Sequence, residues 1–243
     1  SFRSLPFFLT KVKSVNTSRS NTLLKFLYGA LPLPFPQSGD RNGLYGAALL
    51  ANNSLQHLYL PRCLIGDAGC LAVCKAVRCL PNILTLDLTG CELTPLGSGY
   101  IADLVKYQKI HRYSENWIHT LRYRLPELDA MAGLRRITLC ANPQLGDVGV
   151  GKLLDVMADD LWIKALDIQN CGVSDATSSA ALKMMQSNTT LVILDMRHNP
   201  DVMLESLSKI RAALRDNERG MGGQVHIFLK PFATGTRGRT VTS

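Results

Sequence analysis

Three aspartates of this chain stand at the same place in a repeated apolar-Asp-apolar phrase, at Asp87, Asp167 and Asp195. Neighbouring carboxylates of this kind can exchange protons in acid–base catalysis or hold a metal ion. The repeat spacing places no histidine or nucleophile beside them, and the phrase itself is common in short buried strands. We therefore expect neither catalysis nor a metal here. We interpret the aspartates as an acidic stripe that contacts a basic segment of a protein partner.

The histidines and cysteines also lack the spacing of a catalytic or metal site. The five histidines are dispersed, and none lies at ligand spacing from another histidine or a cysteine. Cys70 and Cys74 are four residues apart and are interpreted as core residues of a helix. The spacing of the seven cysteines does not suggest a set of disulfide pairs, which indicates reduced thiols in an intracellular protein. The sequence predicts a protein that is not an enzyme and needs no cofactor.

A longer skeleton, Leu-x-x-Leu-x-Leu-x-x-(Asn or Cys), explains where the aspartates stand. It recurs at intervals of 28, 51, 29 and 28 residues, starting at Leu55, Ile83, Leu134, Ile163 and Leu191. Apolar and polar residues alternate within each unit, which predicts a short strand with one buried face. A fixed period of about 20 to 30 residues with this skeleton is typical of a leucine-rich-repeat solenoid. We predict an α/β fold of the ribonuclease-inhibitor-like type, with parallel strands on the concave face, helices on the convex face and a helical insertion.

Two positions of the repeat have predicted structural roles. The ninth residue is expected to turn the chain off each strand and to satisfy backbone groups that the turn leaves unpaired. It is Cys63, Cys91, Asn142, Cys171 or Asn199. Asp67 and Asp147 each precede an apolar set at helical spacing, and we interpret them as helix start signals.

The 51-residue interval carries a basic and aromatic segment from Lys106 to Arg124. Apolar and aromatic residues advance along it in steps of three and four, which predicts an amphipathic helix, through Ile110, Tyr113, Trp117, Leu121 and Arg124. This helix either packs on the convex side with its basic residues solvated, or forms a docking surface, because Trp, Tyr and Arg are enriched at binding hot spots. The candidate docking residues are Lys109, Arg112, Tyr113, Trp117, Arg122 and Arg124.

The formal net charge of +8 leaves a second class of function open. The insertion is also consistent with a basic module that binds an acidic polymer, such as RNA or the tails of tubulin. Steep loss of binding with added salt would favour this alternative, whereas weak salt dependence with loss on Trp117→Ala would favour protein docking. We expect reversal of Lys109, Arg112 and Arg122 to Glu to leave folding intact, since exposed charges contribute little to stability.

Polar side chains between the strand leucines are expected to line the concave face. The candidate binding residues there are Tyr59, Arg62, Asp87, Arg136, Asp167, Asp195 and Arg197, with His57 and His198 nearby. Opposite charges and aromatic rings together suit a protein better than a nucleic acid. We therefore expect protein partners for this face.

Several runs resemble one particular family, that of the centrosomal protein of 78 kDa. They are residues 121–124, 126–129, 131–139, 160–172 and 188–200, and the likeness is tight across roughly 83–200 and weaker before it. The resemblance implies a repeat domain followed by a coiled-coil region that this chain lacks. It also implies residence at centrioles and ciliary basal bodies, a role in cilium assembly, and contacts with a centriole-duplication kinase and a ubiquitin ligase complex.

The predicted organisation has three parts. Residues 1–23 form an N-terminal capping segment, and residues 24–218 form a repeat domain of about six units with the insertion near 106–132. Residues 219–243 form a C-terminal cap and a basic tail, in which 224–229 adds a final strand. No apolar run approaches the ~18 residues that cross a bilayer, so no membrane contact is expected. The chain does not begin with Met, and we expect a fragment that is monomeric.

Overall fold

A computed structural model describes residues 55–78, 80, 82–120 and 131–220. Strands and helices alternate along this part of the chain. The strands are β1 (His57–Tyr59), β2 (Thr85–Asp87), β3 (Arg136–Thr138), β4 (Ala165–Asp167) and β5 (Ile193–Asp195). The helices are α3 (Gly66–Arg78), α4 (Pro95–Thr120), α5 (Gly146–Met157), α6 (Asp175–Met185) and α7 (Leu204–Gly220).

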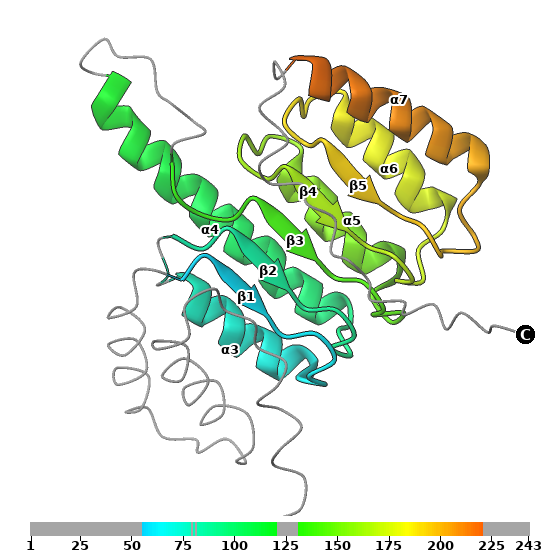
Figure 1. Cartoon of the computed structure of the whole chain (residues 1–243), viewed down its shortest axis with the longest axis horizontal. Coiled ribbons are helices and arrows are strands. Elements are labelled where there is room, and N and C mark those ends of the chain that lie inside the picture. The colour runs from blue at the N-terminus through cyan, green and yellow to red at the C-terminus, as the bar shows by residue number, and fades with distance from the viewer. Residues whose placement is uncertain (1–54, 79, 81, 121–130, 221–243) are drawn as a thin grey trace, which may run out of the picture.

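The described strands form one parallel sheet in the order β1-β2-β3-β4-β5, which is also their order in the sequence. The helices form a second layer that covers one face of this sheet (Figure 1). Each helix packs against the next one along the chain. This arrangement confirms the predicted solenoid, and all five predicted strand segments lie beside their neighbours.

The hydrophobic core lies between the two layers. The middle residue of every strand is buried, and these residues are Leu58, Leu86, Ile137, Leu166 and Leu194. They face inward because successive side chains of a strand point to opposite sides. Cys70 and Cys74 of α3 are buried in the same core, as predicted.

The ninth position of the repeat links neighbouring units, as predicted. The side-chain oxygen of Asn142 accepts hydrogen bonds from the backbone N–H groups of Cys91 and Leu93, at 2.9 and 3.1 Å. Its Nδ2 donates to the carbonyl oxygens of Leu88 and Leu139. Where cysteine replaces asparagine, the thiol donates one bond to the preceding unit, as Cys91 Sγ does to the Leu60 oxygen at 3.1 Å.

The helix-start prediction for Asp67 and Asp147 needs a correction. Both residues lie in the first turn of their own helices, but their carboxylates bond the next unit. Asp67 accepts from the backbone N–H groups of Thr94 and Gly97 at the start of α4, at 3.0 and 2.9 Å. Asp147 accepts from Ser174 and Thr177 at the start of α6. A carboxylate at a helix N-terminus satisfies free N–H groups, so these residues fasten one helix to the next.

The long repeat interval contains the long helix α4, of 26 residues, against 13 for α3 and 12 for α5. At 1.5 Å per residue it is about 39 Å long, and its second half extends beyond both neighbours (Figure 1). The predicted helical insertion is confirmed as far as Thr120. Leu121, Arg122 and Arg124 lie outside the described residues, as do the predicted terminal caps, the basic tail and the strand at 224–229. No helix in the described ranges is long and apolar enough to cross a membrane.

Candidate protein-binding surfaces

The third residues of the strands form one row across the concave face. The register places Tyr59, Asp87, Thr138, Asp167 and Asp195 side by side in that order. The neighbouring strands are about 4.8 Å apart. The row was predicted correctly, but its charges are used differently from the prediction.

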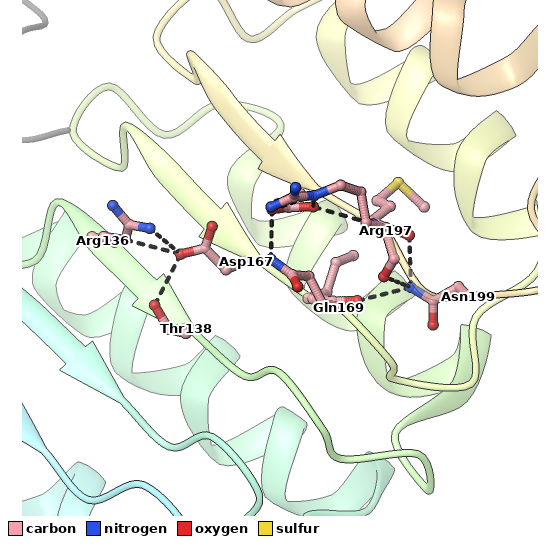
Figure 2. Close-up of polar contacts among 9 residues, drawn as sticks. Arg136, Thr138, Asp167, Gln169, Arg197 and Asn199 are labelled. Atoms are coloured by element: carbon pink, nitrogen blue, oxygen red, sulfur yellow. Dashed lines mark hydrogen bonds and ion pairs between the residues drawn. The ribbon is translucent and has the colours of Figure 1, made fainter. Parts of the chain in front are cut away.

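Asp167 is closed off by two side chains of the preceding unit. It is 4% exposed, and its Oδ2 accepts from Arg136 Nε and Nη2 at 2.9 and 2.7 Å and from Thr138 Oγ1 at 3.0 Å. Figure 2 shows these donors converging on one carboxylate oxygen. Asp167 and Arg136 thus satisfy each other within the sheet, and their role in binding a partner stays a prediction.

Asp195 is bound in a similar way by residues near its own strand. Arg197 Nε lies 2.9 and 3.1 Å from its two carboxylate oxygens, and Gln169 Nε2 donates to Oδ2 at 2.6 Å. Burial acts to raise the pKa of Asp195, but the hydrogen bonds from Arg197 and Gln169 outweigh it, so the pKa lies below its ordinary value. Arg197 is exposed, but its guanidinium is committed to Asp195 (Figure 2).

Asp87 differs from the other two aspartates. Its Oδ1 accepts from the backbone N–H and hydroxyl of Thr89, at 2.9 and 2.6 Å. Among the described residues it forms no ion pair, and burial raises the pKa of its carboxyl above the ordinary value. Hydrogen bonds from Thr89 only partly offset this rise. Asp87 is therefore a half-buried carboxylate whose second oxygen faces the concave surface uncommitted.

The difference between Asp87 and Asp167 follows from one position of the preceding unit. Arg136 supplies the cation for Asp167, and the register places His57 where Arg136 would stand for Asp87. His57 instead bonds Thr85, with its Nδ1 3.1 Å from the hydroxyl oxygen, and stacks on Tyr59 with ring centroids 5.9 Å apart. Burial lowers the pKa of His57, which favours the neutral ring. Asp87 therefore forms no ion pair with the preceding unit, and Arg136 on the other side acts on it only through a small electrostatic effect that lowers its pKa.

Tyr59 and Arg62 border Asp87 on the side of β1. Burial raises the pKa of Tyr59, and the Asp87 carboxylate raises it further, so its hydroxyl stays protonated at neutral pH. Arg62 is exposed in the turn after β1, where its backbone N–H donates to the Thr89 oxygen. Tyr59 and Asp87 are partly exposed and Arg62 is exposed on this part of the concave face, and we call these three predicted residues the concave open site.

One basic residue of the insertion, Arg112, lies inside the protein. Arg112 is 3% exposed, and it donates to the carbonyl oxygens of Ala132 and Leu134 at 2.9 and 3.3 Å. Its guanidinium carbon lies 5.1 Å from the centre of the Trp162 ring. Gly133 leaves the room for it, because a Cβ there would overlap the guanidinium. The prediction of Arg112 as a docking residue is wrong.

Lys109 and Tyr113 also pack against the solenoid. Lys109 Nζ lies 2.5 Å from an Asp159 carboxylate oxygen, and this hydrogen bond lowers the pKa of Asp159. Tyr113 meets Trp162 edge to face, with ring centroids 5.1 Å apart, and remains 42% exposed. Lys109 and Tyr113 thus pack against the solenoid, which favours the packing interpretation for this side of the helix, and their role in docking stays a prediction. Trp117 lies within α4, and Arg122 and Arg124 lie outside the described residues.

Sequence reasoning missed the partners that hold the insertion in place. These are Gln108, Gly133, Asp159 and Trp162. A signal for the orientation of the helix was present in the sequence. Ile101, Leu104, Val105, Gln108 and Arg112 recur at helical spacing and form the face of α4 that packs inward, whereas Ile110 of the predicted stripe is 59% exposed.

The described thiols are suited to the core. Cys63, Cys70, Cys74, Cys91, Cys140 and Cys171 form no disulfide bond. Burial raises the pKa of Cys91 and Cys171 to about 12 and that of Cys140 to about 11, which keeps them protonated at neutral pH. In the ranges that the structure covers, no three His, Cys, Asp or Glu side chains come together as a metal site would require.

The parallel sheet, the outer helices and the Asn/Cys ladder define a leucine-rich-repeat protein. A sequence model described as "Leucine Rich repeat" matches residues 51–74. Two solved structures with a similar fold are the actin-binding site 2 of leiomodin-1 (TM-score 0.56, 12% identity, 76% of this chain and 93% of that chain) and the Caenorhabditis elegans tropomodulin C-terminal domain (TM-score 0.52, 10% identity, 73% and 95%). At these identities the likeness concerns the fold alone.

Closer sequence relatives are centrosomal proteins. The human centrosomal protein of 78 kDa is 46% identical over 178 residues, which cover 73% of this chain and 26% of the relative. The mouse protein of that name is 44% identical over 183 residues (75% and 23%), and the Drosophila melanogaster Protein Cep78 homolog is 36% identical over 155 (64% and 19%). The chain is a leucine-rich-repeat homologue of the centrosomal protein of 78 kDa, which confirms the resemblance. It spans about a quarter of the length of these relatives.

Proposed function

We propose that this chain is a non-catalytic protein-binding scaffold of the centrosome. It acts at centrioles and ciliary basal bodies, and it supports cilium assembly and centriole regulation by docking protein partners. The centrosomal names of its homologues support the cellular setting. A centriole-duplication kinase and a ubiquitin ligase complex are the partners that we propose from the family resemblance.

One observation carries the docking proposal, the unequal use of charge along the concave face. Asp167 and Asp195 are bound by Arg136 and Arg197 within the protein. Asp87 has no such cation among the described residues, and its row neighbour Tyr59 presents an aromatic ring. A positively charged side chain of a partner would pair with Asp87, as Arg136 and Arg197 pair with the other two aspartates.

The chemistry of the concave open site indicates an arginine or lysine of the partner. Burial disfavours the ionised form of Asp87. A guanidinium or ammonium group of the partner would therefore offset the free-energy cost of burying this charge, which an ordinary surface ion pair does not do. Charge-assisted bonds of this kind are stronger than neutral ones, and their removal from an interface costs about 2–5 kcal/mol. Tyr59 beside the carboxylate can contact the stem or the charged group of such a residue.

The test is recruitment of the tagged full chain to centrioles in cells that lack the homologue. We expect the wild-type chain to be recruited and Asp87→Lys to be recruited at least tenfold less. Asp216→Lys, an exposed change on α7, serves as the matched control and should behave like wild type. Equal recruitment of Asp87→Lys and the control would exclude the concave open site, and absence of the wild-type chain from centrioles would contradict the proposal as a whole.

A basic module for RNA or tubulin tails was the alternative. Lys109 and Arg112, two of the basic residues on which it depended, are engaged by Asp159 and by backbone carbonyls. This observation favours the scaffold over the polymer-binding module.

A further inference from the structure

The outer face of α4 differs from the surface of the other helices. Tyr107 is 42% exposed and Ile110 is 59% exposed, and both lie near the middle of α4. Tyr113, also on α4, is 42% exposed, and the remaining large apolar side chains that the structure shows exposed lie in turns or at the starts of helices: Leu64, Leu96, Val148, Met203 and Leu204. Within the described helices, exposed apolar residues beyond the first two turns are therefore concentrated on α4.

The outward direction of these residues is fixed by the packing of the opposite face. Gln108 accepts from the backbone N–H of Leu134 at 3.1 Å, and Arg112 is inserted between Ala132 and Trp162. Residues three or four apart share a face of a helix, so Tyr107, Ile110, His111 and Ser114 are held on the outside. Rotating Ile110 inward would require breaking the buried contacts of Arg112.

Tyr107 is held in place before any partner arrives. The guanidinium carbon of Arg78, from α3, lies 4.9 Å from the centre of its ring. On the following turn, the His111 ring centroid lies 6.3 Å from that of Tyr107. An aromatic side chain that is already ordered loses little conformational entropy on binding. Tyr and Arg are also enriched among residues that dominate binding energies.

The charge of this face indicates what it binds. Arg78 and Lys106 are exposed at its border, and neither forms an ion pair within the described part of the chain. Asp103 is the exposed acidic residue one turn before Tyr107. The border is thus more cationic than anionic around an apolar centre. A complementary partner has apolar side chains in the middle and carboxylates at the edge.

We propose that Arg78, Tyr107, Ile110 and His111, here termed the α4 outer face, dock an acidic amphipathic segment of a protein partner. An aliphatic or aromatic side chain of that segment packs on Tyr107 and Ile110, and its carboxylates meet Arg78 and Lys106. This inference rests on the proposed scaffold function and adds a second surface with a defined partner chemistry. With two border cations, it differs from the long basic groove that a nucleic acid or a polyglutamate tail requires.

The experiment is site-specific photocrosslinking of the full chain in cells that lack the homologue. A photoreactive amino acid replaces Ser114, which is exposed one turn beyond Ile110, and the matched control position is Ala212, exposed on α7. Crosslinked peptides are identified by mass spectrometry. We expect at least fivefold more protein crosslinks at 114 than at 212, on segments that combine Leu, Ile, Met or Phe with an excess of Asp and Glu.

Ile110→Glu in the chain with the probe at 114 is the second arm. It should reduce these crosslinks at least fivefold and leave thermal unfolding within about 2 °C of the parent, because the side chain is exposed. Crosslinks to RNA, to basic segments, to a second copy or to another part of this chain would overturn the inference, as would equal yields at 114 and 212. If Asp87→Lys loses recruitment while Ile110→Glu retains both recruitment and crosslinks, the scaffold proposal stands and the α4 outer face is wrong.

Discussion

Replacing Arg112 by Ala should destabilise the fold strongly, although the residue belongs to a sequence segment that looks like a basic surface. Its side chain makes charge-assisted bonds to two carbonyl oxygens, at 2.9 and 3.3 Å. Hydrogen bonds to charged groups contribute about 1.5–3 kcal/mol each, and a desolvated cation–π contact with Trp162 adds about 2 kcal/mol. After the cost of burying the charge is subtracted, we expect Arg112→Ala to lower the free energy of unfolding by about 3–5 kcal/mol.

The assay is urea unfolding followed by circular dichroism, with thermal melting as a second measurement. For a domain of this size, 1 kcal/mol shifts the melting temperature by about 2–4 °C, so Arg112→Ala should melt roughly 10 °C lower. Gly133→Ala should have a similar effect, because the added Cβ overlaps the guanidinium. Arg215→Ala, exposed on α7, is the control and should change the free energy of unfolding by less than about 0.5 kcal/mol.

A loss below about 1 kcal/mol for Arg112→Ala, with Arg215→Ala equally mild, would refute the assignment of Arg112 to the interior. The expectation that Lys109, Arg112 and Arg122 can be reversed together without loss of folding is wrong on the same grounds. A glutamate at 112 would place a carboxylate next to two backbone carbonyl oxygens. Such a triple variant would report on folding and not on docking.

Three further predictions concern single side chains. Asn142→Ala should lower the free energy of unfolding by about 3 kcal/mol or more, because it leaves two buried N–H groups unpaired; chemical denaturation measures this, and Gln144→Ala, at an exposed position, should be neutral. Asp87→Asn should stabilise the protein at pH 7, since a raised folded pKa means that ionisation opposes folding, and the gain should vanish as the pH falls below about 4. Asp195→Asn should have the opposite effect. Because the pKa of Asp195 is lowered in the folded protein, ionisation of its carboxyl stabilises the fold at pH values above the unfolded pKa. The variant should therefore be less stable than wild type at pH 7, and the difference should shrink as the pH falls through about 4. Unfolding curves at pH 7 and pH 3.5 test both signs, and a pH-independent difference would contradict the pairing described for each carboxylate.

The sheet and its register could be predicted because burial in a repeat is periodic. Leu166 faces the core for the same local reason as Leu86 and Ile137, and each unit repeats that alternation. The bonding of Asn142 followed from its place at the end of the strand, where the turn leaves backbone groups unpaired. These features depend on neighbours a few residues away or on one repeat length.

The pairing of the charged side chains could not be predicted in the same way. Arg136 and Asp167 are 31 residues apart, and Lys109 and Asp159 are 50 residues apart, across the irregular interval. Whether a charge is paired inside or free outside depends on which side chain the neighbouring unit presents. The pairing of Asp167 depends on Arg136 of the preceding unit, and His57 stands at the equivalent position for Asp87. The spacing of Leu104, Val105 and Arg112 partly indicates which face of α4 packs inward. Arg112 obscures this pattern, because an arginine is not recognised as a core residue from the sequence.

The two proposed surfaces belong to one repeat and lie on opposite sides of it. Asp87 is in β2 on the concave side, and Ile110 is in α4, which belongs to the helix layer behind the sheet (Figure 1). The buried core between them is closely packed, and Leu86 and Leu104 of that core have no exposed surface. A partner on one side therefore meets no atom of a partner on the other. We expect the effects of Asp87→Lys and Ile110→Glu on the free energy of binding their respective partners to be independent, since distant sites without shared contacts add within about 0.5 kcal/mol. A double variant that impairs either interaction much more than its single variant does would show that the two faces are coupled through the sheet.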